Sequence, residues 1–183
     1  MATKTLLTVE QFMQLPDDED RPIRRELEQG ELVELPSPTL LHNRICGKFF
    51  VSLTLFAEKK KLGTVVSQTS VRIDSNTVYI PDVVFWDARH AASMDNDEWL
   101  MQIVPQLTVE VASPSNSFPR MLRKARDYRR AGVHTVWVVN ADPFEIHVFD
   151  PGPRRVITAG QTLEAPDILP GFSIDPSLFL PNN

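Results

Sequence analysis

The chain has 183 residues, and 42% of them are hydrophobic, which is enough for one domain over residues 1–183 with its own core. Its 24 acidic and 19 basic residues give a formal net charge of −5. That charge argues against a general polyanion-binding protein, but it leaves room for a nucleic-acid enzyme with a local basic patch. The single cysteine, Cys46, excludes an internal disulfide, so we expect a cytoplasmic protein. We also expect no membrane association, because the sequence shows neither a signal peptide nor a spanning segment.

The N-terminal part of the chain predicts a short helix followed by a β-hairpin. Thr8 and Gln11 have the spacing of a capping box, which opens a helix expected to run to about Leu15. The runs Arg25–Glu28 and Leu32–Leu35 alternate in polarity on either side of Gln29-Gly30. A glycine-containing turn between two such runs indicates an antiparallel hairpin.

The longest helix is predicted over Leu40–Lys61, because its apolar residues recur at helical spacing. The stripe consists of Leu41, Ile45, Phe49, Leu53 and Phe56. The lysines at its end complement the helix dipole, and Gly63 is the expected stop. This gives the lysine run a structural explanation without any role in nucleic-acid binding.

The rest of the chain predicts a mixed sheet and one more helix. Pro81 should bend the strand Val78–Asp87, because proline cannot donate to a sheet. A helix over Pro119–Ala131 should end at Gly132. The other predicted strands are Thr64–Ser67, Ser70–Asp74, Leu107–Ala112, Val133–Asn140 and, at an edge, Glu145–Asp150. We also expect Ala88–Pro105 to be a mobile loop with a short helix, and a C-terminal turn near Asp175–Phe179. The expected fold class is α/β, with a mixed central sheet flanked by helices.

Two acidic residues stand in valine-rich runs where a buried strand should have none. Asp82 follows Pro81 in VYIPDVVFWD, and Glu110 lies within LTVEVA. A buried carboxylate is costly unless it is paired, protonated or bound to a metal. Asp82, Glu110 and the backbone carbonyl of Val111 could together bind Mg²⁺, which prefers oxygen ligands.

The helix after Glu110 supplies a candidate partner for these acids. Lys124 lies at the border between the apolar and the polar face of that helix, one turn before Tyr128, which is an accessory candidate. It is the only lysine after Lys61, so it is the first choice for orienting a water molecule and stabilising charge on phosphorus.

The outer face of the same helix is basic in an acidic protein. A solvated helix face explains these side chains, and contact with a phosphate backbone is the alternative. The candidate contacts are Arg120, Arg123, Arg126 and Arg130.

Other interpretations of the acids stay open. An aspartate after proline is commonly a turn residue, and a glutamate in a strand commonly belongs to a sheet edge. Asp82 and Glu110 could also form a structural network that shares a proton and binds no ion.

Five motifs in chain order resemble one known family. They are E-L-x-x-G-E-L-V-E from Glu26, P-D-V-V-F from Pro81, V-E-V-A-S-P-S from Val109, K-x-x-x-Y from Lys124 and A-G-V…W-V-V from Ala131. Together they resemble the Uma2 family, restriction-endonuclease-like proteins of the PD-(D/E)XK nuclease superfamily, over about residues 8–179.

The resemblance implies an αβββαβ core and a Mg²⁺-dependent phosphodiesterase site. It implies that Asp82 and Glu110 bind the metal. The lysine usual in the superfamily, two residues after the second acid, would fall at Ala112. In Uma2-like proteins that lysine is thought to lie on the following helix, which matches Lys124.

The resemblance also adds two residues that the pattern alone leaves on the surface. Glu26 matches a further family acid, and His42 matches a histidine at the start of the long helix. The chain departs from the family pattern before the lysine, where an acid is replaced by the run Phe118–Arg120, and at Thr135-Val136.

The first hypothesis is therefore an endonuclease that hydrolyses DNA with Mg²⁺ or Mn²⁺ as cofactor. In it, Asp82 and Glu110 hold the metal, while Lys124 and Glu26 assist. The alternative is a catalytically degenerate homodimeric binding or scaffold protein that retains the nuclease fold. A homodimer is expected under both hypotheses, from the family and from the predicted edge strands.

Overall fold

The structure is a computed structural model that describes residues 6–16, 24–112 and 117–180. The helices in these ranges are α1 (Val9–Phe12), α2 (Leu40–Lys60), α3 (Ala88–Ala91), α4 (Phe118–Ala131) and the 3-10 helix η1 (Pro176–Phe179). No helix in the described part of the chain is both long and apolar enough to cross a bilayer.

The strands form two principal sheets and a small hairpin. The six-stranded sheet has the order β11 (Arg155–Ile157), β10 (Phe144–Phe149), β9 (Thr135–Ala141), β8 (Leu107–Val111), β6 (Val83–Asp87) and β3 (Gly63–Ser67). The five-stranded sheet has the order β2 (Glu31–Glu34), β1 (Arg25–Glu28), β5 (Val78–Tyr79), β4 (Ser70–Arg72) and β7 (Leu100–Met101). The hairpin pairs β12 (Leu163–Glu164) with β13 (Ser173–Ile174).

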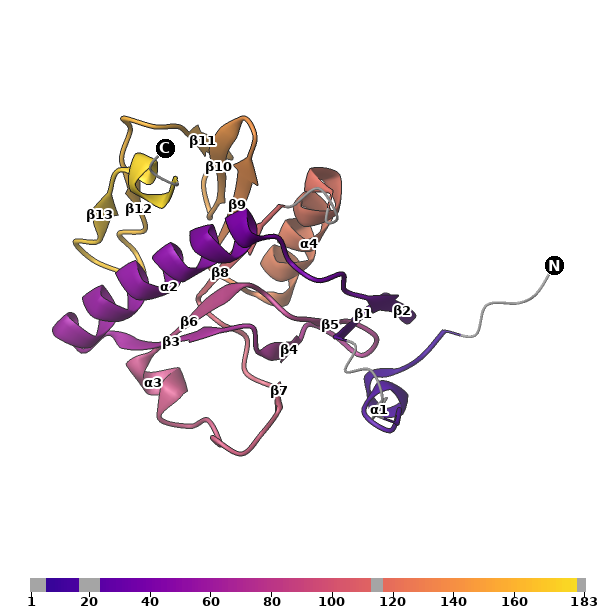
Figure 1. The fold of residues 1–183 in the computed structure, drawn as a ribbon. Coiled ribbons are helices and arrows are strands. Elements are labelled where there is room, and N and C mark those ends of the chain that lie inside the picture. The colour runs from indigo at the N-terminus through magenta and orange to yellow at the C-terminus, as the bar shows by residue number, and fades with distance from the viewer. Residues whose placement is uncertain (1–5, 17–23, 113–116, 181–183) are drawn as a thin grey trace.

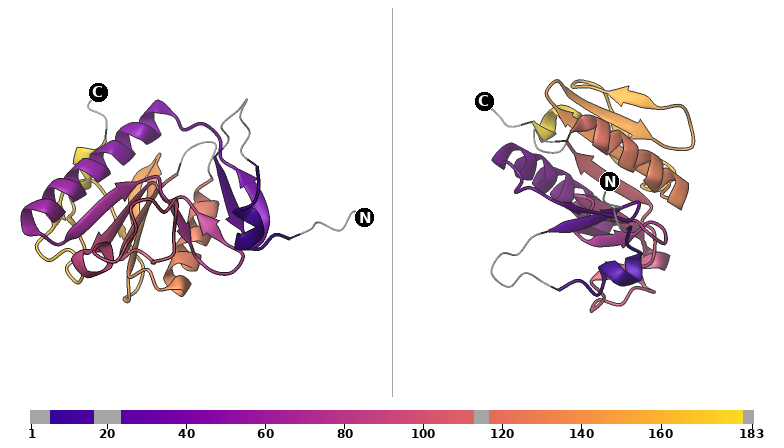
Figure 2. Two further views of the ribbon diagram at one scale, coloured as in Figure 1. Left: turned by 90° about the horizontal axis from the view of Figure 1, so that it is seen from below. Right: turned by 90° about the vertical axis from the view of Figure 1, so that its right-hand side faces the viewer.

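The six-stranded sheet lies between α2 and α4 (Figures 1 and 2). Strands β8 and β9 are parallel and joined through α4, whereas the other pairs in this sheet are antiparallel. Side chains alternate between the faces of a strand. Accordingly, Val109 and Val111 pack in the cluster beneath α2, whereas Val136 and Val138 pack beneath α4. Glu110 lies between the two valines, so its side chain projects toward α4. The mixed sheet between two helices confirms the predicted α/β class.

Aromatic packing fixes α2 on its face of the sheet. Phe49 of α2 stacks on Phe179 of η1 with ring centroids 3.8 Å apart, and its ring lies 6.0 Å from that of Trp137 on β9. All three side chains are buried, and aromatic pairs of this kind add to the energy of burial. The C-terminal segment is thereby packed against the helix that carries His42.

Pro81 marks the crossing of the chain from one sheet to the other, so the predicted bend is confirmed. Strand β5 ends at Tyr79 in the five-stranded sheet, and β6 begins at Val83 in the six-stranded sheet. The backbone N–H of Asp82 donates to the carbonyl of Val109 at 3.1 Å. Asp82 is therefore held at the junction of the two sheets, beside the end of β8.

The predicted helix starts, hairpin and second helix stop are confirmed. Thr8 and Gln11 form the capping box, although the helix is short and ends at Phe12. The hairpin turns at Gln29 and Gly30, whose φ angles of 50° and 85° are those of a primed turn. Helix α4 ends at Ala131 and is capped by Gly132, which adopts the left-handed conformation.

Three details of the prediction are wrong. Helix α2 is stopped by Lys61, which adopts a left-handed conformation with φ of 54°, and Gly63 begins β3 instead. Strand β10 is not at the edge of its sheet, because strand β11, which follows it in the chain, pairs with it on its outer side. The segment Ala88–Pro105 contains the expected short helix, α3, but also the unexpected strand β7, which pairs with β4.

The left-handed cap gives a stability prediction. Lys61→Gly should raise the free energy of unfolding by about 1 kcal/mol, because glycine enters this conformation without the penalty of a Cβ atom. Lys59→Gly removes the same charge two residues earlier, inside α2, and should lower the free energy of unfolding by about 0.5–1 kcal/mol. Chemical denaturation of both variants checks the opposite signs. Equal effects would contradict the assigned cap.

Candidate active site

Five polar side chains, four from helices and strands and one from the segment before β6, meet around one small cavity where the two sheets adjoin. Each is at most 8% exposed. The cavity has a volume of about 30 Å³, the size of one water molecule or small ion. These five, which are among the residues that line it, are Glu26 (β1), His42 (α2), Asp82 (before β6), Glu110 (β8) and Lys124 (α4), and Arg24 also lines it.

Lys124 bridges two of the acids. Its Nζ lies 2.9 Å from Oε1 of Glu26 and 2.5 Å from Oε1 of Glu110. The same ammonium group lies 4.8 Å from the centre of the Tyr79 ring, a cation–π contact. The lysine therefore reaches from α4 to both sheets, and it does not point into solvent.

Glu26 and Glu110 each accept hydrogen bonds from further donors besides Lys124. Glu26 accepts from the backbone N–H of Ile80 at 2.6 Å, and Arg120 donates to its other oxygen at 2.6 Å. Arg120 also pairs with Glu28 on the same strand. Glu110 accepts from the hydroxyl of Tyr128 at 2.6 Å. These bonds hold the carboxylates in fixed orientations.

Asp82 is fixed by a different set of donors on the other side of the cavity. One carboxylate oxygen, Oδ1, lies 3.1 Å from Nε2 of His42. The other, Oδ2, accepts from the backbone N–H of Val111 at 2.8 Å. The backbone N–H of Val111 therefore orients Asp82. The backbone carbonyl of Val111 stays a predicted metal ligand.

Burial and neighbouring charge shift the ionisation of this group of residues. Burial raises the pKa of Glu110 to about 7; the charge of Lys124 opposes the shift, whereas Asp82 and Glu26 add to it. Burial alone would lower the pKa of Lys124, but the two glutamates raise it, so the ammonium form is held. Burial likewise opposes protonation of His42, yet the hydrogen bond and charge of Asp82 raise its pKa. A cluster of carboxylates that repel one another favours a bound cation.

The donor set has the oxygen chemistry of a hard-cation site, although the three described residues whose ligand atoms lie within 4.8 Å of one another are His42, Cys46 and Asp82, not the three carboxylates. Asp82, Glu110 and Glu26 offer carboxylate oxygens at one ion-sized cavity, which is the ligand chemistry of Mg²⁺ and Mn²⁺. In the structure Lys124 neutralises part of this charge.

The structure brings together Glu26, His42, Asp82, Glu110 and Lys124, which were all selected from the sequence. It adds two residues that were not selected, Cys46 and Glu28. Ala112 is buried and carries no charge, and Lys124 supplies the amine from α4. Cys46 and Glu28 were missed at the sequence level. Cys46 lies four residues after His42 on a predicted helix, and Glu28 lies two residues after Glu26 on a predicted strand. Each spacing places two side chains on one face, a signal that could have identified both residues.

A wider groove of about 560 Å³ adjoins the site along α4 and β1. Lys124 and Tyr79 line it, so the groove and the small cavity share the lysine. Its basic side chains outnumber its acidic ones; they are Arg120, Arg123, Lys124, Arg126 and Arg130, against Glu28, Glu31 and Asp127. Arg123, Arg126 and Arg130 are exposed, whereas Arg120 is turned inward to Glu26 and Glu28.

The chain has relatives in a known protein family and a solved structure of similar fold. Residues 9–177 match the family model "Uma2: Putative restriction endonuclease", and the chain belongs to this family. A crystal structure described as a putative nuclease belonging to DUF820, from Anabaena variabilis ATCC 29413, has a similar fold with a TM-score of 0.83 at 16% identity, covering 94% of this chain and 97% of the other. No curated protein matched the chain.

The buried lysine gives a prediction about stability. Lys124→Met should lower the free energy of unfolding by about 3–5 kcal/mol, because it leaves Glu26 and Glu110 buried without their shared partner. Arg123→Met removes the same charge from the exposed side of α4 and should change the free energy of unfolding by no more than about 0.5 kcal/mol. Urea unfolding measures both variants.

A double variant separates the ion pair from side-chain packing. Adding Glu110→Gln to Lys124→Met should recover part of the loss, since a neutral amide is cheaper to bury than an unpaired carboxylate. A Lys124→Met variant that is no less stable than Arg123→Met would show that the ion pairs contribute nothing measurable.

Proposed function

We propose that this protein is an endonuclease that hydrolyses DNA phosphodiester bonds with Mg²⁺ or Mn²⁺ as cofactor. The observation that carries the proposal is the convergence of Glu26, Asp82, Glu110 and Lys124 on one ion-sized cavity that shares its lysine with a basic groove. The Uma2 membership and the nuclease-like fold support it.

The side chains divide the work as follows. Asp82 and Glu110 hold the metal, oriented by the N–H of Val111 and the hydroxyl of Tyr128. A bound divalent ion supplies a Lewis acid for the phosphate and acidifies a coordinated water. The ammonium group of Lys124, fixed next to Glu110, stabilises negative charge that develops on the phosphate oxygens. Glu26 keeps that ammonium in place.

The groove provides a path for the DNA backbone to this site. Arg123, Arg126 and Arg130 are exposed along it, and such side chains bind phosphates without reading sequence. Arg120 supports the site from within, through its pairing with Glu26 and Glu28. The net charge of −5 restricts polyanion binding to this local surface. We further propose that the protein acts in the cytoplasm.

Isosteric substitutions test the nuclease activity. Asp82→Asn and Glu110→Gln should each lower the rate of Mg²⁺- or Mn²⁺-dependent cleavage of plasmid DNA about a hundredfold or more, and EDTA should abolish it. Asp150→Asn, at the far end of β10 and paired with Arg155, is the control and should keep the wild-type rate. Cleavage that survives both site substitutions would contradict the proposal.

One observation favours the alternative, a non-catalytic scaffold that retains the nuclease fold. Lys124 and Arg120 already neutralise Glu26, Glu28 and Glu110, so the site is partly charge-balanced without a metal. Calorimetric titration separates the two functions. Saturable Mn²⁺ binding in the wild type that weakens in Asp82→Asn supports the nuclease, and the lack of binding at millimolar Mn²⁺ supports the scaffold.

We also propose that the chain forms a homodimer through the outer face of α2. Val51 and Leu55 are 52% and 64% exposed on this face. Arg44 and Glu58 lie seven residues before and after Val51, so a two-fold axis through an antiparallel pair of α2 helices at Val51 brings Arg44 opposite Glu58 of the other copy. Leu55 then faces Gly47, where an added Cβ atom would meet nothing within 4 Å, so the leucine has room to pack.

Light scattering on a sizing column tests this arrangement. The wild type should be a dimer, Val51→Glu should be a monomer, and Val156→Glu, on the exposed strand β11, should remain a dimer. Arg44→Glu should weaken the dimer, and Arg44→Glu with Glu58→Arg should restore it. A monomeric wild type, or a dimeric Val51→Glu, would exclude this interface.

A further inference from the structure

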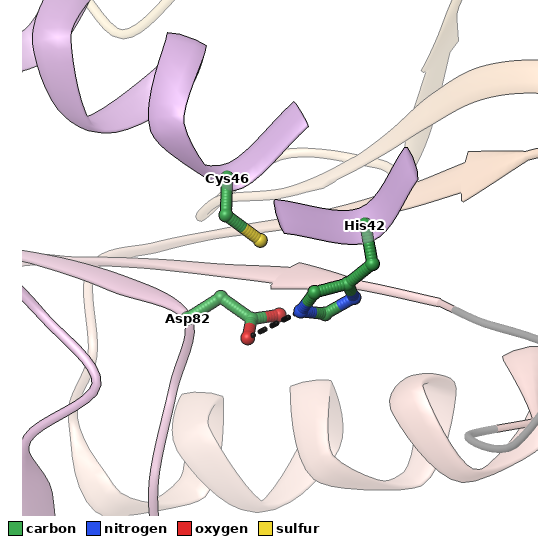
Figure 3. Close-up of side chains that lie close together, drawn as sticks. All are labelled: His42, Cys46 and Asp82. Carbon is green, nitrogen blue, oxygen red and sulfur yellow. Dashed lines mark hydrogen bonds and ion pairs between the residues drawn. The ribbon is translucent and has the colours of Figure 1, made fainter. Parts of the chain in front are cut away.

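A second ligand set lies on the α2 side of Asp82. His42 and Cys46 are four residues apart, so they occupy successive turns on one face of α2. Figure 3 shows both side chains pointing toward Asp82. One ligand atom from each residue can be chosen so that all three lie within 4.8 Å of one another.

The spacing of these atoms suits a small tetrahedral ion. Nε2 of His42 and Oδ1 of Asp82 are 3.1 Å apart. Two ligands on one tetrahedral Zn²⁺ ion, each bonded at about 2.0–2.1 Å, are separated by about 3.4 Å. The metal could therefore replace the His42–Asp82 contact with a small outward shift, and Cys46 would close the set from the next turn.

The surroundings already hold the ligands in place. His42, Cys46 and Asp82 are 5%, 8% and 8% exposed. The first turn of α2 is fixed by Thr39, whose side chain accepts from the backbone N–H of His42 at 3.2 Å. The orientation of Asp82 is fixed by the N–H of Val111. A site in which burial and a second set of contacts orient the ligands loses little entropy when it binds a metal.

The chemistry of this set differs from that of the cavity beside it. A sulfur and an imidazole nitrogen favour Zn²⁺, Co²⁺ and similar ions, whereas Mg²⁺ favours the oxygens of Glu26, Asp82 and Glu110. Without a metal, burial and the negative charges of Asp82 and Glu110 raise the pKa of the Cys46 thiol. A coordinating metal reverses this local balance, because it deprotonates a thiol ligand.

We propose that His42, Cys46 and Asp82 bind Zn²⁺ or another thiophilic divalent ion, and that this ion takes Asp82 away from the catalytic metal. Binding at the three residues stands on the geometry alone. The consequence, inhibition of cleavage by Zn²⁺, rests on the proposed nuclease function. Asp82 would then be shared by two metal sites of opposite preference, one supporting activity and one suppressing it.

Cobalt spectroscopy tests the binding without any assay of activity. Tetrahedral Co²⁺ bound to a thiolate gives a charge-transfer absorption band, and Cys46 is the only cysteine in the chain, so the band reports this residue alone. Titration of the reduced wild type with Co²⁺ should give the band with one ion per chain, and Zn²⁺ should displace it. A wild type that stays folded in excess Co²⁺ without the band overturns the proposal.

Variants identify the other two ligands. Cys46→Ala should lose the band, while His42→Ala and Asp82→Asn should each weaken Co²⁺ binding at least about tenfold. His90→Ala is the matched control: His90 pairs with Asp87 at 2.8 Å but has no cysteine beside it, so its removal should leave the titration unchanged. Circular dichroism shows whether each variant is folded. A band that is unaffected by both His42→Ala and Asp82→Asn would indicate a lone thiol and overturn the three-residue site.

A separate measurement tests the inhibition. If the protein cleaves DNA with Mg²⁺, added Zn²⁺ should inhibit it, and Cys46→Ala should shift the inhibition to at least about tenfold higher Zn²⁺. Inhibition at the same Zn²⁺ concentration in both proteins would overturn the competition for Asp82. A protein that shows the cobalt band but cleaves no DNA would refute the proposed function and leave the metal site in place.

Discussion

The contact between Lys124 and the two glutamates Glu26 and Glu110 is the constraint on which the rest of the site depends. Each glutamate belongs to a different sheet, and the lysine belongs to the helix that connects β8 to β9. All three are almost fully buried, where an unpaired charge costs several kcal/mol by order of magnitude. The pairing therefore requires both sheets and α4 to be in place before the site exists.

Pro81 supplies the other half of the arrangement. Because the chain leaves the five-stranded sheet at Tyr79 and enters the six-stranded sheet at Val83, Asp82 falls between them with its backbone tied to Val109. The carboxylate can then meet both the end of β8 and the first turn of α2. A regular strand through this point would have directed Asp82 to one face of one sheet only.

Much of this architecture follows from the sequence. The turn at Gln29-Gly30, the apolar stripe of α2, and the bend at Pro81 have local causes that operate in any context. The same is true of the selection of Asp82 and Glu110, since a charge in a valine-rich strand requires a partner. Lys124 is identifiable because it is the only lysine after Lys61.

Other features depend on contacts between distant segments and were not visible in the pattern. Arg120 pairs with Glu26, which is far from it in the chain. Because the sequence does not show this pairing, Arg120 looks like a surface residue on the polar face of its helix. The covering of β10 by β11 is likewise decided by tertiary pairing, because β11 is short and mostly exposed. The helix stop at Lys61 is also unexpected from the sequence, because a lysine pays a Cβ penalty in the left-handed conformation that glycine avoids.

The central claim is that these buried carboxylates form a metal-binding catalytic centre. The most direct test is a crystal of the protein grown with Mn²⁺, with the ion located by its anomalous scattering. The account predicts a Mn²⁺ peak in the cavity lined by Glu26, Asp82 and Glu110, bonded to oxygens of Asp82 and Glu110, with Lys124 beside it. A cavity without a peak at saturating Mn²⁺, with Lys124 still paired to both glutamates, would contradict it.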